Sequence, residues 1–134
     1  MQCAEKKYLT VIIPFLNEGE EVVMTVKSVR KTAGDKVDII TINDCSTDGF
    51  PYRERLQPYS VTYLENEVRM GVAASRDYGI NYCATPYFLL LDGHMRFYDA
   101  AWSSLFLPKD GILPYHARVW TQMDGLYLLN NKSL

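Results

Sequence analysis

The apolar run YFLLL (residues 87–91) ends at Asp92-Gly93-His94. A carboxylate and an imidazole two residues apart at a strand end can both face one divalent cation, and Gly93 between them would let the backbone turn sharply. This oxygen and nitrogen pair suits Mn²⁺ better than Mg²⁺, which prefers all-oxygen shells. Two protein ligands would leave most of an octahedral shell open for substrate phosphates. A capped turn with a half-buried histidine and no metal fits the same tripeptide, so its spacing leaves both interpretations open.

A second polar cluster is DCSTDG (residues 44–49), which follows the apolar run VDIITIN. Its oxygens have the spacing that begins an EF-hand calcium loop, but position twelve of such a loop falls on Arg55, where a bidentate glutamate is required. The flanking segments also resemble strands rather than helices. We therefore exclude an EF-hand, and a turn with side-chain hydrogen bonds to the backbone remains the alternative to a ligand-binding loop.

A third cluster is RMGVAASRDYG (residues 69–79), in which Arg69 and Arg76 lie near the start of a predicted helix. A helix N-terminus with nearby arginines is a favourable place for a phosphate group. The spacing does not match a Walker A loop, and no G-x-G-x-x-G follows the first apolar run. The cluster thus fits phosphate binding without the usual P-loop or dinucleotide motifs.

The elements that must position these clusters alternate between strands and helices. We predict strands at residues 8–15, 37–43, 61–65 and 87–91. One helix would begin after an Asn17 cap and stop at Gly34, and a second would cover residues 71–84, closed by Thr85-Pro86. Weaker patterns predict a helix at residues 100–107 and strands at 112–115 and 117–120. This order predicts an α/β fold with a mostly parallel sheet flanked by helices.

Polar residues follow three of the predicted strands directly. Strand one ends at Asn17-Glu18, strand two at residues 43–48, and strand four at residues 92–94. In open α/β sheets, ligands bind outside the carboxyl ends of the strands, near the point where the strand order reverses. We therefore expect these polar ends to converge on one edge of the sheet, which is stronger support for a site than any single cluster.

Composition places the chain among ordinary globular proteins. It has 134 residues, 48% of them hydrophobic and 22% charged, and a net charge of −2, so we expect one domain (residues 1–134) and no nucleic-acid partner. Three widely spaced cysteines without CxxC spacing favour a reducing compartment. The start lacks the pattern of a signal peptide, and no segment has the roughly 18 apolar residues of a membrane span. We expect a cytoplasmic protein without a transmembrane segment.

Taken in order, the clusters resemble motifs of the family 2 glycosyltransferases, which have the nucleotide-sugar-binding GT-A fold. VIIPFLNE resembles their first-strand motif and VDIITINDCSTDG their second-strand motif. MGVAASRDYGI is similar to their Gly-x-x-x-Ala-Arg-Asn helix, and YFLLLDGH to their Asp-x-Asp strand end. The resemblance covers about residues 8 to 107. The Asp-x-His form is similar to that of the polypeptide N-acetylgalactosaminyltransferases.

The resemblance implies a role for several positions. Asp44 would accept a hydrogen bond from uracil or another base, while Pro14, Asn17 and Glu18 would border the nucleotide pocket. Arg76 would lie near the diphosphate. Asp92 would reach the ribose and the metal, and His94 would be a metal ligand. The metal, Mn²⁺ or Mg²⁺, would neutralise the diphosphate leaving group.

Some positions depart from the family pattern. Leu16 stands where many relatives have an aromatic residue or a histidine against the base, Asn43 replaces the first aspartate of a pair, and Asp77 replaces the asparagine after the arginine. In relatives, a longer C-terminal half supplies the acceptor site and the catalytic base, so the fold would be truncated here. The late candidates His116 and Asp124 have no motif around them, and we interpret both as turn or surface residues.

The function implied is transfer of a sugar from a UDP-sugar or another nucleoside-diphosphate sugar to an unknown acceptor, which could be a glycan, a lipid or a protein. No catalytic base is identified. One alternative is a truncated or non-catalytic module that binds a nucleotide sugar without turnover. A nucleotidyltransferase shares the sheet and the metal, but it normally has a Gly-rich basic loop after the first strand, where this chain has the acidic PFLNEGEE (residues 14–21).

Overall fold

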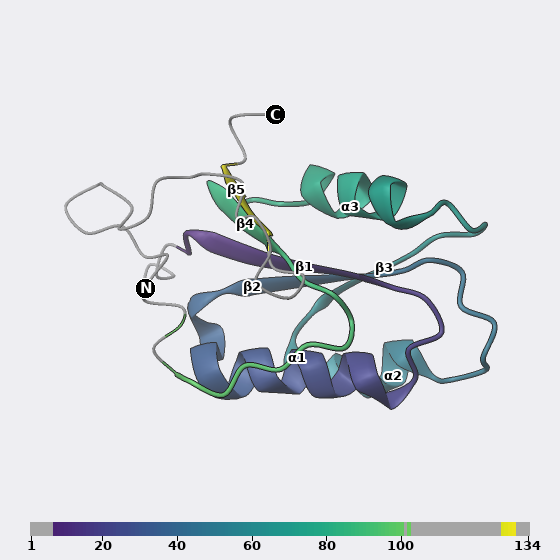
Figure 1. Ribbon diagram of the computed structural model, residues 1–134, viewed down its shortest axis with the longest axis horizontal. Helices are drawn as coiled ribbons and strands as arrows, with labels where there is room; N and C mark the ends of the chain where they lie inside the picture. The colour runs from purple at the N-terminus through teal and green to yellow at the C-terminus, as the bar shows by residue number, and fades with distance from the viewer. Residues whose placement is uncertain (1–6, 101, 103–126, 131–134) are drawn as a thin grey trace, which may run out of the picture.

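The computed structural model describes residues 7–100, 102 and 127–130, which form a sheet with helices on both faces (Figure 1). The strands are β1 (Leu9–Phe15), β2 (Asp38–Asn43), β3 (Thr62–Glu65), β4 (Tyr87–Leu90) and β5 (Tyr127–Asn130). The α-helices are α1 (Glu20–Ala33), α2 (Tyr52–Leu56) and α3 (Val72–Asn81), and the short 3₁₀ helices are η1 (Gly34–Lys36) and η2 (Gln57–Tyr59). The four predicted strands and two predicted long helices are all present.

The sheet has the strand order β3-β2-β1-β4-β5. β1 pairs in parallel with β2 and β4, so that Val11 lies beside Ile39 on one side and Leu89 on the other. β3 continues the parallel order beside β2, and β5 alone runs antiparallel, beside β4. The strand order therefore reverses between β1 and β4, which confirms the predicted α/β fold with a mostly parallel sheet.

Strands β1, β2 and β4 are buried on both faces, as their continuous apolar runs predict. Successive side chains of β1 enter opposite layers: Val11 and Ile13 belong to the apolar cluster that includes the buried face of α1, whereas Ile12 belongs to the cluster packed against α3. Figure 1 shows α1 and α2 on one face of the sheet and α3 on the other. The α1 layer also contains Val22, Val26 and Val29, whose helical spacing places them on one face of α1. Two apolar layers therefore hold the strand ends in fixed relative positions.

Helix α1 begins later than predicted. Its N-cap is Gly19, which has a φ of 56°, and the expected cap Asn17 lies two residues earlier with a φ of 52°. The Asn17 side chain instead accepts a hydrogen bond from the Thr47 backbone N–H at 2.7 Å. The capping prediction was wrong because two residues, not none, separate Asn17 from the helix, and its amide serves the loop after β2.

Helix α3 lies close to the sheet at a glycine. A Cβ added to Gly79 would lie 2.7 Å from both Ile12 Cγ2 and Ile42 Cδ1, so only glycine lets the helix approach this closely. The helix ends at Asn81 rather than residue 84, because the backbone N–H of Tyr82 donates to the Gly79 carbonyl in a closing turn. Thr85 belongs to the entry of β4, where its hydroxyl lies 2.7 Å from that of Thr10.

Some of the remaining predictions can be compared with the structure, and others fall outside the residues that it describes. The short element between β2 and β3 consists of α2 and η2, and β5 was not predicted. The predicted helix at residues 100–107 lies mostly outside the described residues, as do the predicted strands at 112–115 and 117–120 and the candidates His116 and Asp124. Within the described part of the chain, no helix is long and apolar enough to span a bilayer.

Candidate functional site

A cavity of about 180 Å³ opens at the carboxyl ends of β1, β2 and β4, where the strand order reverses. The end of β1 lines it with Pro14 and Phe15. The segments that follow β1 and β2 add Leu16, Glu18 and Asp44. The start of α3 and the turn after β4 supply Arg69, Gly71, Val72, Ser75, Asp92, Gly93 and His94. This volume is below the roughly 300–1,000 Å³ of typical ligand pockets, so it fits part of a nucleotide.

Asp44 is the most deeply buried ionisable group of this cavity, with 5% of its surface exposed. Its Oδ1 accepts hydrogen bonds from Asn66 Nδ2 at 2.9 Å and from the Met70 backbone N–H at 2.7 Å, and its Oδ2 accepts one from the Gly71 N–H at 2.9 Å. A carboxylate has about four acceptor sites, so one site on Oδ2 is left by these contacts.

The surroundings of Asp44 favour its ionised form. Burial alone would raise the pKa of the Asp44 carboxyl, but the three hydrogen bonds and the nearby charge of Arg69 outweigh burial and lower the pKa from its ordinary value. Asp44 is therefore a carboxylate at neutral pH, and it ties the end of β2 to the loop that begins α3.

Asn66 and Ser75 complete this network, and the sequence analysis missed both. Asn66 Nδ2 donates to Ser75 Oγ at 2.9 Å as well as to Asp44, and its backbone N–H donates to the Asn43 carbonyl at 2.8 Å. Asn66 follows β3 directly, so it is a fourth polar residue after a strand. That position in the sequence is the signal that could have identified it.

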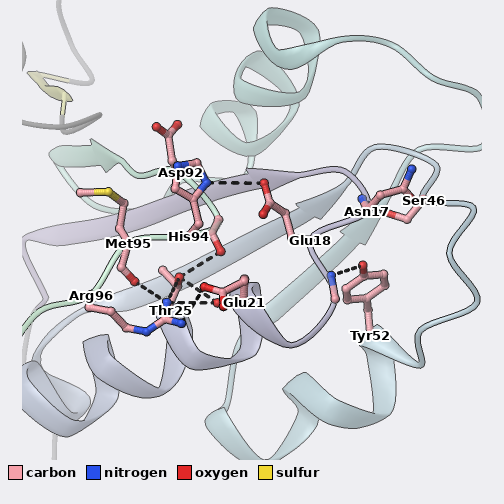
Figure 2. Close-up of polar contacts among 12 residues, drawn as sticks. Asn17, Glu18, Glu21, Thr25, Ser46, Tyr52, Asp92, His94, Met95 and Arg96 are labelled. Carbon is pink, nitrogen blue, oxygen red and sulfur yellow. Dashed lines mark hydrogen bonds and ion pairs between the residues drawn. The ribbon is translucent and has the colours of Figure 1, made fainter.

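The Asp-Gly-His turn after β4 places two side chains on the cavity. Asp92 Oδ1 lies 4.0 Å from Arg76 Nη2. His94 Nδ1 lies 3.6 Å from Glu18 Oε1 (Figure 2). Gly93 between them has no positive φ, so the reason predicted for a glycine here was wrong. A Cβ at Gly93 would lie 3.1 Å from Phe15 Cβ and 3.2 Å from Glu18 Cγ, so the glycine relieves a tight contact with both side chains.

Hydroxyl groups of α1 hold the segment that follows this turn, which we call the strap (residues 93–100 and 102). Thr25 Oγ1 lies 3.0 Å from the carbonyl oxygens of both Gly93 and Glu21, which share its one hydrogen. The same hydroxyl accepts from Arg96 Nη1 at 3.0 Å (Figure 2). One turn further along the helix, Ser28 Oγ accepts from the Phe97 backbone N–H at 3.1 Å. The strap therefore runs along α1, and its first residue is fixed from a buried helix position.

The far end of the strap is anchored by the same helix. Trp102 Nε1 donates to Thr32 Oγ1 at 2.6 Å, and the Trp102 ring stacks on Phe97 with centroids 4.1 Å apart. Thr25, Ser28 and Thr32 thus form a stripe of hydroxyls along one side of α1. Because the strap is bound at both ends, the position of the Asp-Gly-His turn depends on α1 as well as on β4.

Two of the predicted site residues are not among those that line the cavity. Asn17 is exposed, and its side chain binds the loop after β2 as described above. Arg76 Nη2 lies 4.0 Å from Asp92 Oδ1, whereas Arg69 lines the cavity itself. Pro14, Glu18, Asp44, Asp92 and His94 all line it. Their predicted roles toward a nucleotide remain predictions.

The cavity offers an incomplete set of metal ligands. Across the described residues, no three or more histidine, cysteine, aspartate or glutamate side chains are grouped closely enough to enclose a metal ion. Asp92 and His94 nevertheless line one cavity, as an oxygen and a nitrogen donor. Such a partial set fits a cation whose remaining positions are filled by substrate phosphates. The residues present are thus compatible with the predicted cation.

Comparison with known proteins identifies the family. Residues 10–110 match the family described as Glycosyl transferase family 2, which is well over half of the chain. The chain belongs to glycosyl transferase family 2. Over 84 residues this family 2 chain is 29% identical to an uncharacterized glycosyltransferase of Haemophilus influenzae. The match covers 63% of the chain and 28% of that relative.

Solved structures share the fold of the family 2 chain. A mannosyltransferase, PcManGT from Pyrobaculum calidifontis in complex with GDP-Man and Mn²⁺, matches 72% of the chain with a TM-score of 0.64 and 20% identity. S. aureus TarS 1-349 in complex with UDP matches 65% with a TM-score of 0.58 and 18% identity. These likenesses confirm the predicted GT-A fold. The chain spans 30% and 27% of these two proteins.

Proposed function

We propose that this chain holds the donor half of a glycosyltransferase site and binds a nucleoside-diphosphate sugar together with a divalent cation. The observation that carries the proposal is the single cavity that brings Asp44, after β2, together with Asp92 and His94, after β4. The cavity thus offers both a carboxylate acceptor and cation ligands. A nucleotide sugar has matching ends, a base with N–H donors and a diphosphate.

Different residues of the cavity would bind different parts of the nucleotide sugar and its cation. Asp44 keeps one acceptor site on Oδ2 and would use it for a base N–H, while Leu16 offers only an apolar contact beside the base. Asp92 and His94 would hold the cation, with Arg69 adding positive charge on the α3 side. When bound, the cation would neutralise the diphosphate as the glycosidic bond breaks. The acceptor and its binding site are not assigned.

The identity of the base is proposed as uracil, following the role predicted for Asp44. The two structural relatives differ on this point, because one was solved with GDP-Man and the other with UDP. Isothermal titration of UDP and GDP, each with and without Mn²⁺, tests the proposal. We expect UDP to bind more tightly than GDP and only with Mn²⁺. The proposal would be contradicted if neither nucleotide showed Mn²⁺-dependent binding.

His94→Ala is expected to remove Mn²⁺-dependent UDP binding while leaving the fold intact. His94 is 58% exposed at its side chain, so its loss opens no core cavity. The affinity should fall by more than the roughly 10- to 100-fold that loss of a residue behind a metal ligand costs. Tyr98→Ala, which changes a strap residue that is 89% exposed, serves as the control and should bind as the unchanged chain does. Equal Mn²⁺ dependence in His94→Ala would remove His94 from the proposed ligands.

A non-catalytic module that binds the same nucleotide sugar is separated from an enzyme by turnover. Release of UDP from a UDP-sugar above the uncatalysed rate, abolished in His94→Ala, would support the transferase. Binding without release would support the module. The cytoplasmic location inferred from the cysteines and the start of the sequence, and the likeness to polypeptide N-acetylgalactosaminyltransferases, stay predictions.

A further inference from the structure

Glu18 and His94 form a pair across the point where the strand order reverses. Glu18 follows β1 and His94 follows β4, and Figure 2 shows the carboxylate of the first facing the ring of the second. The nearest atoms are Glu18 Oε1 and His94 Nδ1, 3.6 Å apart, which is an ion-pair distance rather than a hydrogen bond. The ring nitrogen nearer to the carboxylate is therefore Nδ1.

The packing of Glu18 fixes this pairing. Its side chain lies over Gly93, where an added Cβ would come within 3.2 Å of Glu18 Cγ. Gly93 is in turn held by the buried Thr25 hydroxyl on its carbonyl oxygen. The aliphatic part of Glu18 thus passes over the middle residue of the Asp-Gly-His turn, and its carboxylate reaches the third.

The other glutamates nearby have different partners. Glu20 pairs with Arg55, and Glu21 pairs with Arg96. Glu18 is the glutamate of this acidic stretch that lines the cavity, and the side chain it faces there is the ring of His94. Glu18 is also poorly placed to be a third metal ligand itself, because it does not form a three-member ligand cluster with Asp92 and His94 within the described part of the chain.

A neutral imidazole carries one N–H and one lone pair, and its surroundings decide which nitrogen has which. Metal-binding histidines commonly donate their second ring N–H to a carboxylate, which fixes both the tautomer and the ring orientation. We propose that Glu18 is a positioning residue: when the two side chains close from 3.6 Å to hydrogen-bond distance, its carboxylate accepts from His94 Nδ1–H and so presents the lone pair of Nε2 to the divalent cation. The cation role rests on the proposed function, whereas the pairing itself does not.

The pairing is tested by the tautomer of His94 in the metal-free chain. Long-range ¹H–¹⁵N NMR at about pH 8, where histidines are ordinarily neutral, distinguishes Nδ1–H from Nε2–H, and the chain has only two histidines to assign. We expect Nδ1–H in the unchanged chain and in Glu18→Gln, whose amide oxygen can still accept. Glu18→Leu should shift His94 to the Nε2–H form. An unchanged tautomer in Glu18→Leu would overturn the proposal.

The consequence for the cation is tested by EPR titration of free Mn²⁺ in the presence of UDP. Glu18→Leu should weaken Mn²⁺ binding by about 10- to 100-fold, and Glu18→Gln should restore most of it. Glu20→Leu, which removes the carboxylate paired with Arg55, is the matched control and should bind normally. A loss in Glu18→Gln as large as in Glu18→Leu would mean that the charge itself binds the metal, which would overturn the positioning role.

The two tests separate this proposal from the one on which it rests. If the unchanged chain shows no Mn²⁺-dependent UDP binding, the proposed function fails and the cation role of Glu18 fails with it. If binding is present but the His94 tautomer does not depend on Glu18, only the positioning role fails. Thermal unfolding of each variant checks that the fold is retained, which is expected because Glu18 is partly exposed.

Discussion

Asp44→Asn is expected to lower the free energy of unfolding by about 2–4 kcal/mol and to abolish UDP binding. The carboxylate accepts three hydrogen bonds from protein groups at both of its oxygens. An asparagine turns one oxygen into an NH₂ donor, which must then face either the Gly71 N–H or the donors from Asn66 and Met70. Because the site is buried, one donor would be left without an acceptor. Urea unfolding and titration with UDP and Mn²⁺ measure the two effects.

The effect of Asp44 should depend on pH in a defined direction. Its pKa is lower in the folded state than its ordinary value, so its stabilisation is complete above the unfolded-state pKa of about 3.9. That stabilisation is lost as the pH falls through the folded-state pKa. The stability difference between the unchanged chain and Asp44→Asn should therefore shrink in this acidic range. Asp77→Asn, at an exposed α3 position, should stay within about 0.5 kcal/mol of the unchanged chain; an equal loss in both variants would contradict the argument.

Arg30→Met is expected to destabilise the fold by about 2–4 kcal/mol without weakening nucleotide binding in the protein that remains folded. The Arg30 guanidinium donates to the carbonyls of Gly34 and Val37, which link α1 to β2, at 2.9 and 2.8 Å. It also donates to the carbonyls of Tyr59 and Ser60, before β3, at 2.7 and 3.0 Å. Methionine keeps an unbranched apolar stem but donates to none of the four.

Denaturant unfolding of Arg30→Met measures this loss, with Lys27→Met as the control because Lys27 is exposed on the same helix. UDP titration at a temperature where both variants are folded measures the second half of the prediction. Arg30 is absent from the cavity lining, so its variant should bind as tightly as the control. A loss of UDP affinity in Arg30→Met at full folding would show that this end of α1 reaches the site.

The sequence predicted the parts of the fold that depend on local pattern. The apolar β-branched runs at residues 8–15 and 37–43 match β1 and β2 to within a residue, and the helix predicted to stop at Gly34 matches α1, which ends at Ala33. These features follow from side-chain periodicity, which the sequence displays directly. The antiparallel β5 depends on pairing with β4, and no local pattern indicated it.

The candidate site was predicted less completely, because its contacts join residues that are distant in the sequence. The strand-end rule correctly brought Glu18, Asp44 and the Asp-Gly-His turn to one cavity. It could not show that Asn17 serves the loop after β2, since that depends on the backbone of Thr47. Nor could it show why residue 93 is a glycine, because Phe15 and Glu18, more than 70 positions away in the chain, approach it.

The hydroxyl stripe on α1 bears on which positions of this region can vary over evolutionary time. Thr25 and Ser28 bind the strap through its backbone, at the Gly93 carbonyl and the Phe97 N–H. Any residue at position 97 except proline supplies that N–H, and Tyr98, Asp99 and Ala100 are exposed. Substitutions should therefore be tolerated at these exposed positions of the strap, whereas the small hydroxyl residues of α1 that bind its backbone should be retained. The residues that must be retained to hold the turn with Asp92 and His94 in place are thus mostly residues of α1, outside the tripeptide itself.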